Sequence, residues 1–120
     1  MTKACRFALP LVLALAATVC SAAAAGYSPL DCTKAVTATE KAICSNYGLG
    51  QAEARMSSLY QWATSFVAMG QRGSLQEAQG AFIKKRESCG ADARCIRNLY
   101  DARIEALEAV MENVKRHGPF

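Results

Sequence analysis

The chain is poor in the side chains that most often carry catalysis. It has one histidine, His117, close to its C-terminal end, and one tryptophan, Trp62. The sequence offers no serine–histidine or cysteine–histidine pairing, no glycine-rich phosphate loop, and no carboxylate pair that stands apart from surface acids. We therefore predict that the protein is not an enzyme and that it uses no cofactor.

The spacing of the cysteines argues against metal and redox chemistry as well. Eleven residues separate Cys32 from Cys44 and five separate Cys89 from Cys95, whereas zinc sites usually place about two to four residues between paired cysteines. The C-x-x-C pair of redox-active proteins is absent. We expect no metal site and a structural role for these cysteines.

Only one long apolar run occurs, and it lies at the N-terminus. Two basic residues precede the run from Phe7 to Val19, and small residues follow it. The run is shorter than the roughly 20 residues of a transmembrane helix, and the pattern is typical of a secretory signal. We expect residues 1–25 to be a signal peptide cleaved near Ala25. Residues 26–120 should then form a single domain, periplasmic or secreted.

Neither sign of charge is in large excess. Loss of Lys3 and Arg6 with the signal lowers the basic residues from 14 to 12, against 10 acidic residues, for a net charge of +2. A balance this close to neutral favours no polyanionic partner, so we expect no nucleic-acid binding.

Two of the six cysteines, Cys5 and Cys20, fall within the N-terminal segment. Cys20 is a candidate for lipid attachment, but the branched Val19 stands where a lipoprotein signal has a small residue. Loss of Cys20 with the signal is the favoured interpretation. The remaining four cysteines are Cys32, Cys44, Cys89 and Cys95. In a small exported domain, four cysteines indicate two disulfides, with three possible pairings.

Hydrophobic residues recur at three- and four-residue steps in the remaining chain, and no segment alternates with the period of a β-strand. We predict an all-α fold, a small antiparallel bundle of three main helices with a short helix before them, stapled by two disulfides. Capping boxes and turn residues set the expected boundaries. These are a short helix from Thr37 to Cys44, a helix after Asn46, a break at Gly70–Gly73, a helix from Ser74 to Cys89, and a last helix from Asp92 to Gly118.

The expected corner between the last two helices selects one pairing. Cys89 ends one helix, and Cys95 lies in the first turn of the next. A tight corner brings these two within bridging distance, so we predict the disulfide Cys89–Cys95. The other bridge is then Cys32–Cys44, which ties the irregular N-terminal lead to the short helix.

Two arginines interrupt the apolar pattern. On a helical wheel Arg86 and Arg103 each fall within the apolar face of their helix. A buried guanidinium must be paired, because its lost hydration is costly. We expect Glu40 to pair with one of them. The alternatives are that Glu40 only caps its helix, or that the arginines reach the edge of the apolar face.

The cysteine framework resembles the LprI-type lysozyme-inhibitor domain. Cys32 and the segment Glu40–Cys44 are similar to the opening of that family. Gln79, Phe82, Arg86 and Cys89 resemble its Q-x-x-W-x-x-x-R-x-x-C segment, although Phe82 stands where tryptophan is common. Its closing C-x4-Y-x2-R-I-x2-L pattern corresponds to Cys95, Tyr100, Arg103, Ile104 and Leu107. The similarity covers residues 32–107.

The resemblance implies an exported cell-envelope protein that binds a lysozyme-type glycosidase and blocks its cleft. The alternative is an interaction module of the envelope with another partner and no effect on lysozyme. Because the chain offers no nucleophile or base, inhibition is expected to rest on surface complementarity. Exposure and charge suggest three contact residues: Arg72 in the glycine-flanked turn, Arg94 at the Cys89–Cys95 corner, and Trp62 beside the apolar stripe of its helix. For Trp62 the favoured alternative is packing against the neighbouring helix.

Overall fold

The structure, a computed structural model, describes residues 29–118 and contains four α-helices and one short 3-10 helix in this range. The expected signal peptide and Cys20 lie outside the described residues. After the 3-10 helix Cys32–Lys34 come α1 (Ala38–Ser45), α2 (Tyr47–Phe66), α3 (Met69–Ser88) and α4 (Ala93–His117). The described part of the chain has no strand, and the predicted all-α class is confirmed.

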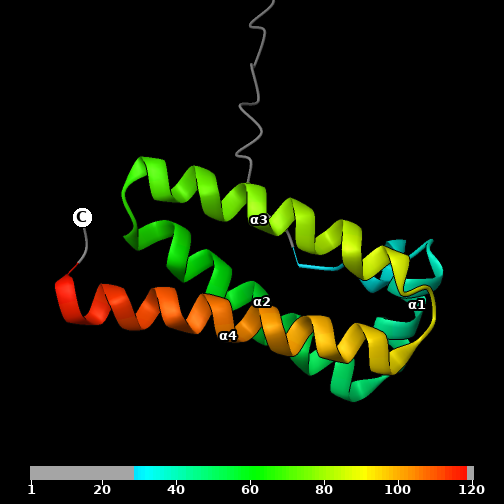
Figure 1. Ribbon diagram of the computed structural model, residues 1–120. Helices are drawn as coiled ribbons and strands as arrows, with labels where there is room; N and C mark the ends of the chain where they lie inside the picture. Colours follow the sequence, from blue (N-terminus) through cyan, green and yellow to red (C-terminus); the bar gives the residue numbers. More distant parts are fainter. Residues whose placement is uncertain (1–28, 119–120) are drawn as a thin grey trace, which may run out of the picture.

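The three long helices lie side by side and alternate in direction along the chain, with α1 at one end of the bundle (Figure 1). Helices α2 and α4 therefore run in the same direction, and they form the most extensive helix–helix contact. Helix α3 runs antiparallel to both. The turn between α2 and α3 and the end of α4 lie at one end of the bundle, which we call the distal end. The corner between α3 and α4 lies at the opposite end, beside α1.

Local capping explains most helix starts. Thr37 and Glu40 form the predicted capping box at the start of α1, and Asn46 caps α2 by accepting a hydrogen bond from the Leu49 amide. Asp92 accepts two backbone N–H bonds at the start of α4. These polar side chains satisfy amides that have no partner within their own helix.

The predicted break at Gly70–Gly73 is wrong. The chain turns earlier, at Val67 and Ala68, and α3 already begins at Met69. Val67 is fully buried and anchors the turn in the core, whereas the two glycines lie in an exposed helical turn that tolerates them at about 1 kcal/mol each. Ser74 does not cap the helix; its hydroxyl donates to the carbonyl of Gly70.

A single core runs along the bundle between the three long helices. Tyr100, Ile96 and Leu107 of α4 and Met56 of α2 are fully buried, and Ile43 of α1 closes the end of the core near the disulfides. The tilted rings of Phe82 and Tyr100 lie with their centres 5.4 Å apart and join α3 to α4. Burial of this apolar stripe is what stabilises the bundle.

Both disulfides lie at the end of the bundle that carries α1. The structure contains the expected pairs Cys32–Cys44 and Cys89–Cys95, with Cα–Cα distances of 5.6 and 5.7 Å. Gly90, at φ 57°, adopts the left-handed conformation that ends α3. The corner between α3 and α4 is thus fixed by a bridge, a glycine and the Asp92 cap.

Candidate functional site

A buried polar network crosses the core near the disulfides. Arg86 of α3 donates through Nη1 to Oε2 of Glu53 in α2 at 3.2 Å and to the hydroxyl of Tyr100 in α4 at 3.1 Å. The Tyr100 hydroxyl donates in turn to the same Glu53 oxygen. The side chains of Arg86 and Glu53 are only 5 % and 7 % exposed. The network therefore ties all three long helices together through charged groups removed from water.

The N-terminal lead completes this network. The amide of Leu30 donates to the second Glu53 oxygen, Oε1, at 3.1 Å, and the Cys32–Cys44 disulfide holds the lead against α1. Burial and the negative charge of Glu53 raise the pKa of the Tyr100 hydroxyl, which therefore stays protonated as a donor. A carboxylate that accepts bonds from a guanidinium, a phenol and an amide is well compensated for its lost hydration.

The second inward arginine is held without a carboxylate partner among the described residues. Arg103 donates from Nε to Oε1 of Gln79 at 2.9 Å and from Nη2 to the carbonyl of Leu75 at 3.3 Å. Gln79 donates onward to the sulfur of Met56 at 3.2 Å. Burial lowers the pKa of Arg103, and the nearby Tyr60 opposes that shift. Arg103 therefore joins α4 to α3 through neutral acceptors.

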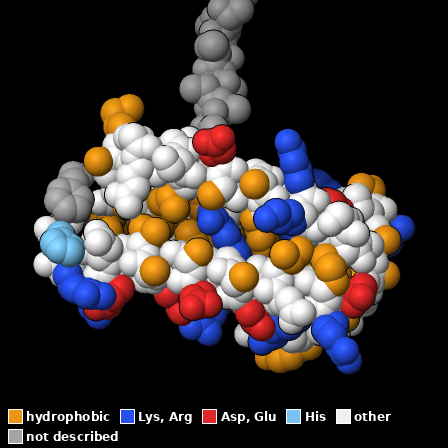
Figure 2. All heavy atoms as spheres, in the orientation of Figure 1, with side chains coloured by type: hydrophobic (Ala, Val, Ile, Leu, Met, Phe, Trp, Pro, Cys, Tyr) orange, Lys and Arg blue, Asp and Glu red, His pale blue; other side chains and the backbone are white. Residues whose placement is uncertain are grey.

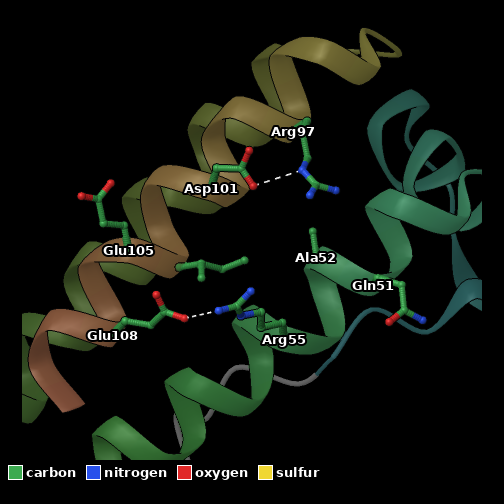
Figure 3. Close-up of a pocket in the computed structure, with 8 residues that line it drawn as sticks. Gln51, Ala52, Arg55, Arg97, Asp101, Glu105 and Glu108 are labelled. Atoms are coloured by element: carbon green, nitrogen blue, oxygen red, sulfur yellow. Dashed lines mark hydrogen bonds and ion pairs between the residues drawn. The ribbon is translucent and has the colours of Figure 1, made fainter. Parts of the chain in front are cut away.

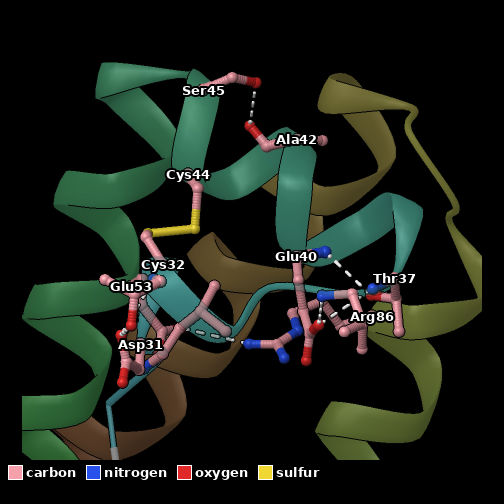
Figure 4. The surroundings of a disulfide bond; sticks show 12 residues. Asp31, Cys32, Thr37, Glu40, Ala42, Cys44, Ser45, Glu53 and Arg86 are labelled. Atoms are coloured by element: carbon pink, nitrogen blue, oxygen red, sulfur yellow. Dashed lines mark hydrogen bonds and ion pairs between the residues drawn. A yellow bond between two sulfur atoms is a disulfide. The ribbon is translucent and has the colours of Figure 1, made fainter.

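The predicted pairing of Glu40 with an inward arginine is wrong. Both Glu40 hydrogen bonds come from backbone amides, those of Val36 at 2.8 Å and Thr37 at 3.0 Å, in the capping arrangement of Figure 4. The prediction that Arg86 and Arg103 are buried is right, but the carboxylates that pair with Arg86 are those of the buried Glu53 and of its neighbour Glu87, at 3.2 and 3.3 Å. The capping bonds leave Glu40 only a weak electrostatic interaction with Arg86.

The capping bonds of Glu40 should make the stability of the protein depend on pH in a measurable way. The amides of Thr37 and Val36 hold the pKa of Glu40 below its usual 4.5, with a smaller contribution from Arg86. A lowered folded-state pKa contributes stability above the unfolded pKa, and this contribution is lost as the pH falls through the folded value. In urea unfolding measured from pH 6 to pH 2.5, Glu40→Gln should therefore lose less stability below about pH 4.5 than the unmodified protein. Parallel pH profiles of the two proteins would contradict this assignment.

Thr39 fixes the corner between α3 and α4 from the side of α1. Its hydroxyl lies 2.8 Å from the carbonyl oxygen of Gly90, and 3.3 and 3.4 Å from those of Glu87 and Arg86. The carbonyls of Arg86 and Glu87 belong to the last turn of α3, and that of Gly90 follows the helix, so Thr39 contacts the end of α3 where intrahelical amides run out. Thr39 is fully buried and was not singled out from the sequence. Its contacts make the corner rigid as well as covalently closed.

The surface of this corner is open and partly basic. A shallow depression of about 530 Å³ lies over it, lined among others by Lys85, Asp92 and Arg94. Arg94 is exposed, and its guanidinium forms no hydrogen bond or ion pair within the described residues. The structure therefore places this predicted contact residue on the surface of the rigid corner, with its side chain exposed.

A second depression lies on the groove between α2 and α4 (Figure 3). It encloses about 360 Å³ and carries two internal ion pairs, Arg55 with Glu108 and Arg97 with Asp101. The Arg97 guanidinium also donates to the carbonyl of Gly48 at 3.1 Å, across the two helices. Because these charges are already paired, the groove is interpreted as part of the α2–α4 contact.

The other two predicted contact residues lie at the distal end. Trp62 is 58 % exposed and stacks on Phe66 with ring centres 5.6 Å apart, while Arg72 is half-buried in the first turn of α3. Consecutive corners of an up-and-down bundle lie at opposite ends, so Arg72 and Arg94 are separated by the length of α3. The structure brings Trp62 and Arg72 to one end but does not bring Arg94 to them.

The described region has structural cysteines and no candidate metal centre. Among residues 29–118 no group of three or more His, Cys, Asp or Glu side chains could hold a metal, and the cysteines there are disulfide-bonded. The same region contains no helix long and apolar enough to cross a membrane. What the fold presents is a stapled corner with the exposed Arg94 at one end and an exposed aromatic patch at the other.

Residues 32–115 match the family described as "Lysozyme inhibitor LprI". The chain belongs to this family. Its curated relatives include the proteins named "Lipoprotein LprI" of Mycobacterium tuberculosis and Mycobacterium bovis, each 31 % identical over 108 residues.

The similarity covers 81 % of this chain and 53 % of each relative, so the chain spans about half the length of the curated relatives it matches. No solved structure matches it. The four bridged cysteines, the network of Glu53, Arg86 and Tyr100, and Arg103 all lie within the segment that matches the LprI family. The LprI family is named for inhibition and not for catalysis.

Proposed function

We propose that this LprI domain acts in the cell envelope, where it binds a lysozyme-type glycosidase and blocks its cleft. The proposal starts from the family match over residues 32–115. Lysozyme-type enzymes cleave with a pair of carboxylates that flank the scissile bond in a cleft. Blocking such a cleft needs a protrusion that enters it, and no chemistry by the inhibitor.

The observation that carries the proposal is the rigid corner between α3 and α4. The Cys89–Cys95 bridge, the left-handed Gly90 and the Thr39 hydroxyl hold this corner in one conformation. A preorganised loop loses little conformational entropy on binding, so more of its contact energy appears as affinity. In this respect the corner is better suited to enter a cleft than a mobile loop would be.

Arg94 supplies a charge that complements the carboxylates of such a cleft. It is exposed at the corner and forms no ion pair with the residues that the structure describes. A guanidinium forms two parallel hydrogen bonds to a carboxylate, and arginine is enriched among the residues that dominate binding energy. The adjacent depression, with Lys85 and Leu99 in its lining, offers room for the rim of the partner.

Arg94→Ala is expected to weaken inhibition about 30-fold or more, the effect of removing a dominant contact residue. The measurement is lysis of cell walls by lysozymes of several types, with and without purified residues 26–120 in their disulfide-bonded form. Arg72→Ala is the matched control, because it removes the same charge at the far end of α3. Urea unfolding of both variants verifies that the fold is intact.

If Arg72→Ala and Arg94→Ala weaken inhibition equally, the corner is not the contact surface. If the unmodified domain at micromolar concentration slows no lysozyme, the domain is an interaction module of the envelope with another partner. The intact mass of the exported chain separately distinguishes cleavage near Ala25 from lipid attachment at Cys20.

A further inference from the structure

The distal end of the bundle has an exposed apolar patch that the inhibitory corner does not use. Trp62 and Met69 are 58 % and 84 % exposed, and Phe66 lies half-buried beneath the Trp62 ring. These residues flank the buried Val67 turn, so they are held at the very end of α2 and the start of α3. We call Trp62, Phe66 and Met69 the distal patch.

Positive charge gathers at the same end. The first turn of α3 contributes Arg72, and the last turns of α4 contribute Lys115 and Arg116, with Glu112 as the only acidic side chain in these turns. Lys115 and Arg116 both lie beside Glu112, which leaves this end with a net charge of +2. Figure 2 shows the histidine and neighbouring basic side chains at the end where α4 finishes.

The remaining described residues are electrically balanced. Outside those turns the described part of the chain has nine basic and nine acidic side chains, so the distal end holds the whole positive excess of the domain. The Nε–H of Arg72 is buried and has no acceptor within the described residues. The terminal Nη groups of this half-buried guanidinium have no ion-pair partner within the described residues, so they are the donors that an anionic group outside the molecule could reach.

We propose that the distal end binds reversibly to an anionic lipid surface, with Trp62 and Met69 entering the headgroup layer and Arg72, Lys115 and Arg116 facing lipid phosphates. Tryptophan favours the boundary between headgroups and acyl chains because its ring is apolar and its N–H is polar. Basic side chains near an anionic bilayer add about 1 kcal/mol each. Apolar insertion and charge attraction together are the signature of interfacial binding.

The positive charge of the distal end favours an anionic bilayer over two other possible occupants, a second copy of the chain and a basic protein. A second copy of the chain meeting this end through a two-fold axis would bring two +2 surfaces together, which repel each other. A basic protein partner would be repelled in the same way. An anionic bilayer complements both the apolar patch and the charge around it.

The only tryptophan of the chain lies in the distal patch, so it reports directly on the proposed contact. Residues 26–120 contain every described helix, both disulfides and the whole core, and they lack the apolar N-terminal run. Adding vesicles rich in phosphatidylglycerol to this protein should shift the Trp62 emission to shorter wavelength. Phosphatidylcholine vesicles, or added salt at about 1 M, should largely remove the shift because the charges are screened.

Matched substitutions at the two ends test the position of the contact by co-sedimentation. Lys115→Gln should weaken binding to anionic vesicles about fivefold, whereas Lys34→Gln should leave it unchanged. Both lysines are exposed (75 % and 83 %) and lie beside an acid three residues earlier, but Lys34 lies in the lead at the opposite end. Met69→Ser should also weaken binding, and Tyr47→Ser, equally exposed at 84 % beside α1, should not.

Three results would overturn the proposal. The first is no emission shift with anionic vesicles. The second is equal binding losses for Lys34→Gln and Lys115→Gln, or for Tyr47→Ser and Met69→Ser. The third is a concentration-dependent shift without vesicles, together with a dimeric mass in light scattering, which would assign the patch to a second copy. Inhibition of lysozyme through Arg94 is independent of all three.

Discussion

Glu53→Ala is expected to cost about 3 kcal/mol of unfolding free energy, because it removes the buried carboxylate partner of Arg86 and leaves the buried guanidinium with the partly exposed Glu87 as its ion-pair partner. Arg86 is 4 % exposed and cannot reach water without opening the interface between α2, α3 and α4. The same substitution removes the acceptor of the Leu30 amide and of the Tyr100 hydroxyl. Urea unfolding of the disulfide-bonded protein at pH 7 measures the loss.

Glu108→Ala is the matched control for this prediction. Glu108 also pairs with an arginine of another part of the bundle, Arg55, but the two side chains are 45 % and 64 % exposed. Exposed pairs contribute about 1 kcal/mol or less, since water and salt compensate for the lost partner. Equal losses for Glu53→Ala and Glu108→Ala would mean that burial does not set the energy of the network.

A double substitution separates the buried charge from the packing. Glu53→Gln combined with Arg86→Met removes both charges while keeping most of the side-chain volume. The double variant should be more stable than the sum of the two single losses predicts, by about 1–3 kcal/mol, since residues in one network couple. Strict additivity would show that Glu53 and Arg86 act separately.

The arrangement of helices could be predicted because it depends on local signals. Periodic apolar residues, the Thr37 capping box, the Asp92 cap and the left-handed Gly90 each act within one or two turns of chain. The burial of Arg86 and Arg103 followed from their positions on apolar faces. The break before α3 was misplaced because two glycines outweighed the buried Val67, whose role depends on packing.

The partner of Arg86 was missed although a signal for it exists. Glu53 lies four residues after Leu49 and three before Met56, so it occupies the apolar face of α2 just as Arg86 occupies that of α3. A pair of opposite charges on two apolar faces indicates a buried ion pair. Glu40 was favoured instead, but its oxygen is held by the amides of Val36 and Thr37, close in sequence.

The separation of the predicted contact residues could also have been derived from topology. Arg72 belongs near the corner between α2 and α3, and Arg94 to the corner between α3 and α4. In an up-and-down bundle successive corners lie at opposite ends, so these two arginines cannot line one small surface. The hydrogen bond of the Thr39 hydroxyl to the Gly90 carbonyl, with the carbonyls of Glu87 and Arg86 close by, was not foreseeable, because it depends on how α1 crosses that end.

Removing the Cys32–Cys44 bridge, as Cys32→Ala with Cys44→Ala, should cost about 3 kcal/mol on the chain-entropy account of disulfides. Removing Cys89–Cys95 should cost less, about 2 kcal/mol, because its loop is shorter. The sequence separations of the bridged cysteines are 12 and 6. Alanine pairs avoid free thiols, and thermal and urea unfolding under non-reducing conditions measure both variants.

The two bridges also differ in what they hold. Cys32–Cys44 fixes the lead whose Leu30 amide donates to Glu53, whereas Thr39 supports the corner even without Cys89–Cys95. In a Glu53→Ala background the first removal should therefore cost less than in the unmodified protein, because the bond from Leu30 is already lost. The cost of removing Cys89–Cys95 should not change in that background. The same cost for Cys32–Cys44 in both backgrounds would show that the bridge acts on the unfolded chain alone and does not support the buried network.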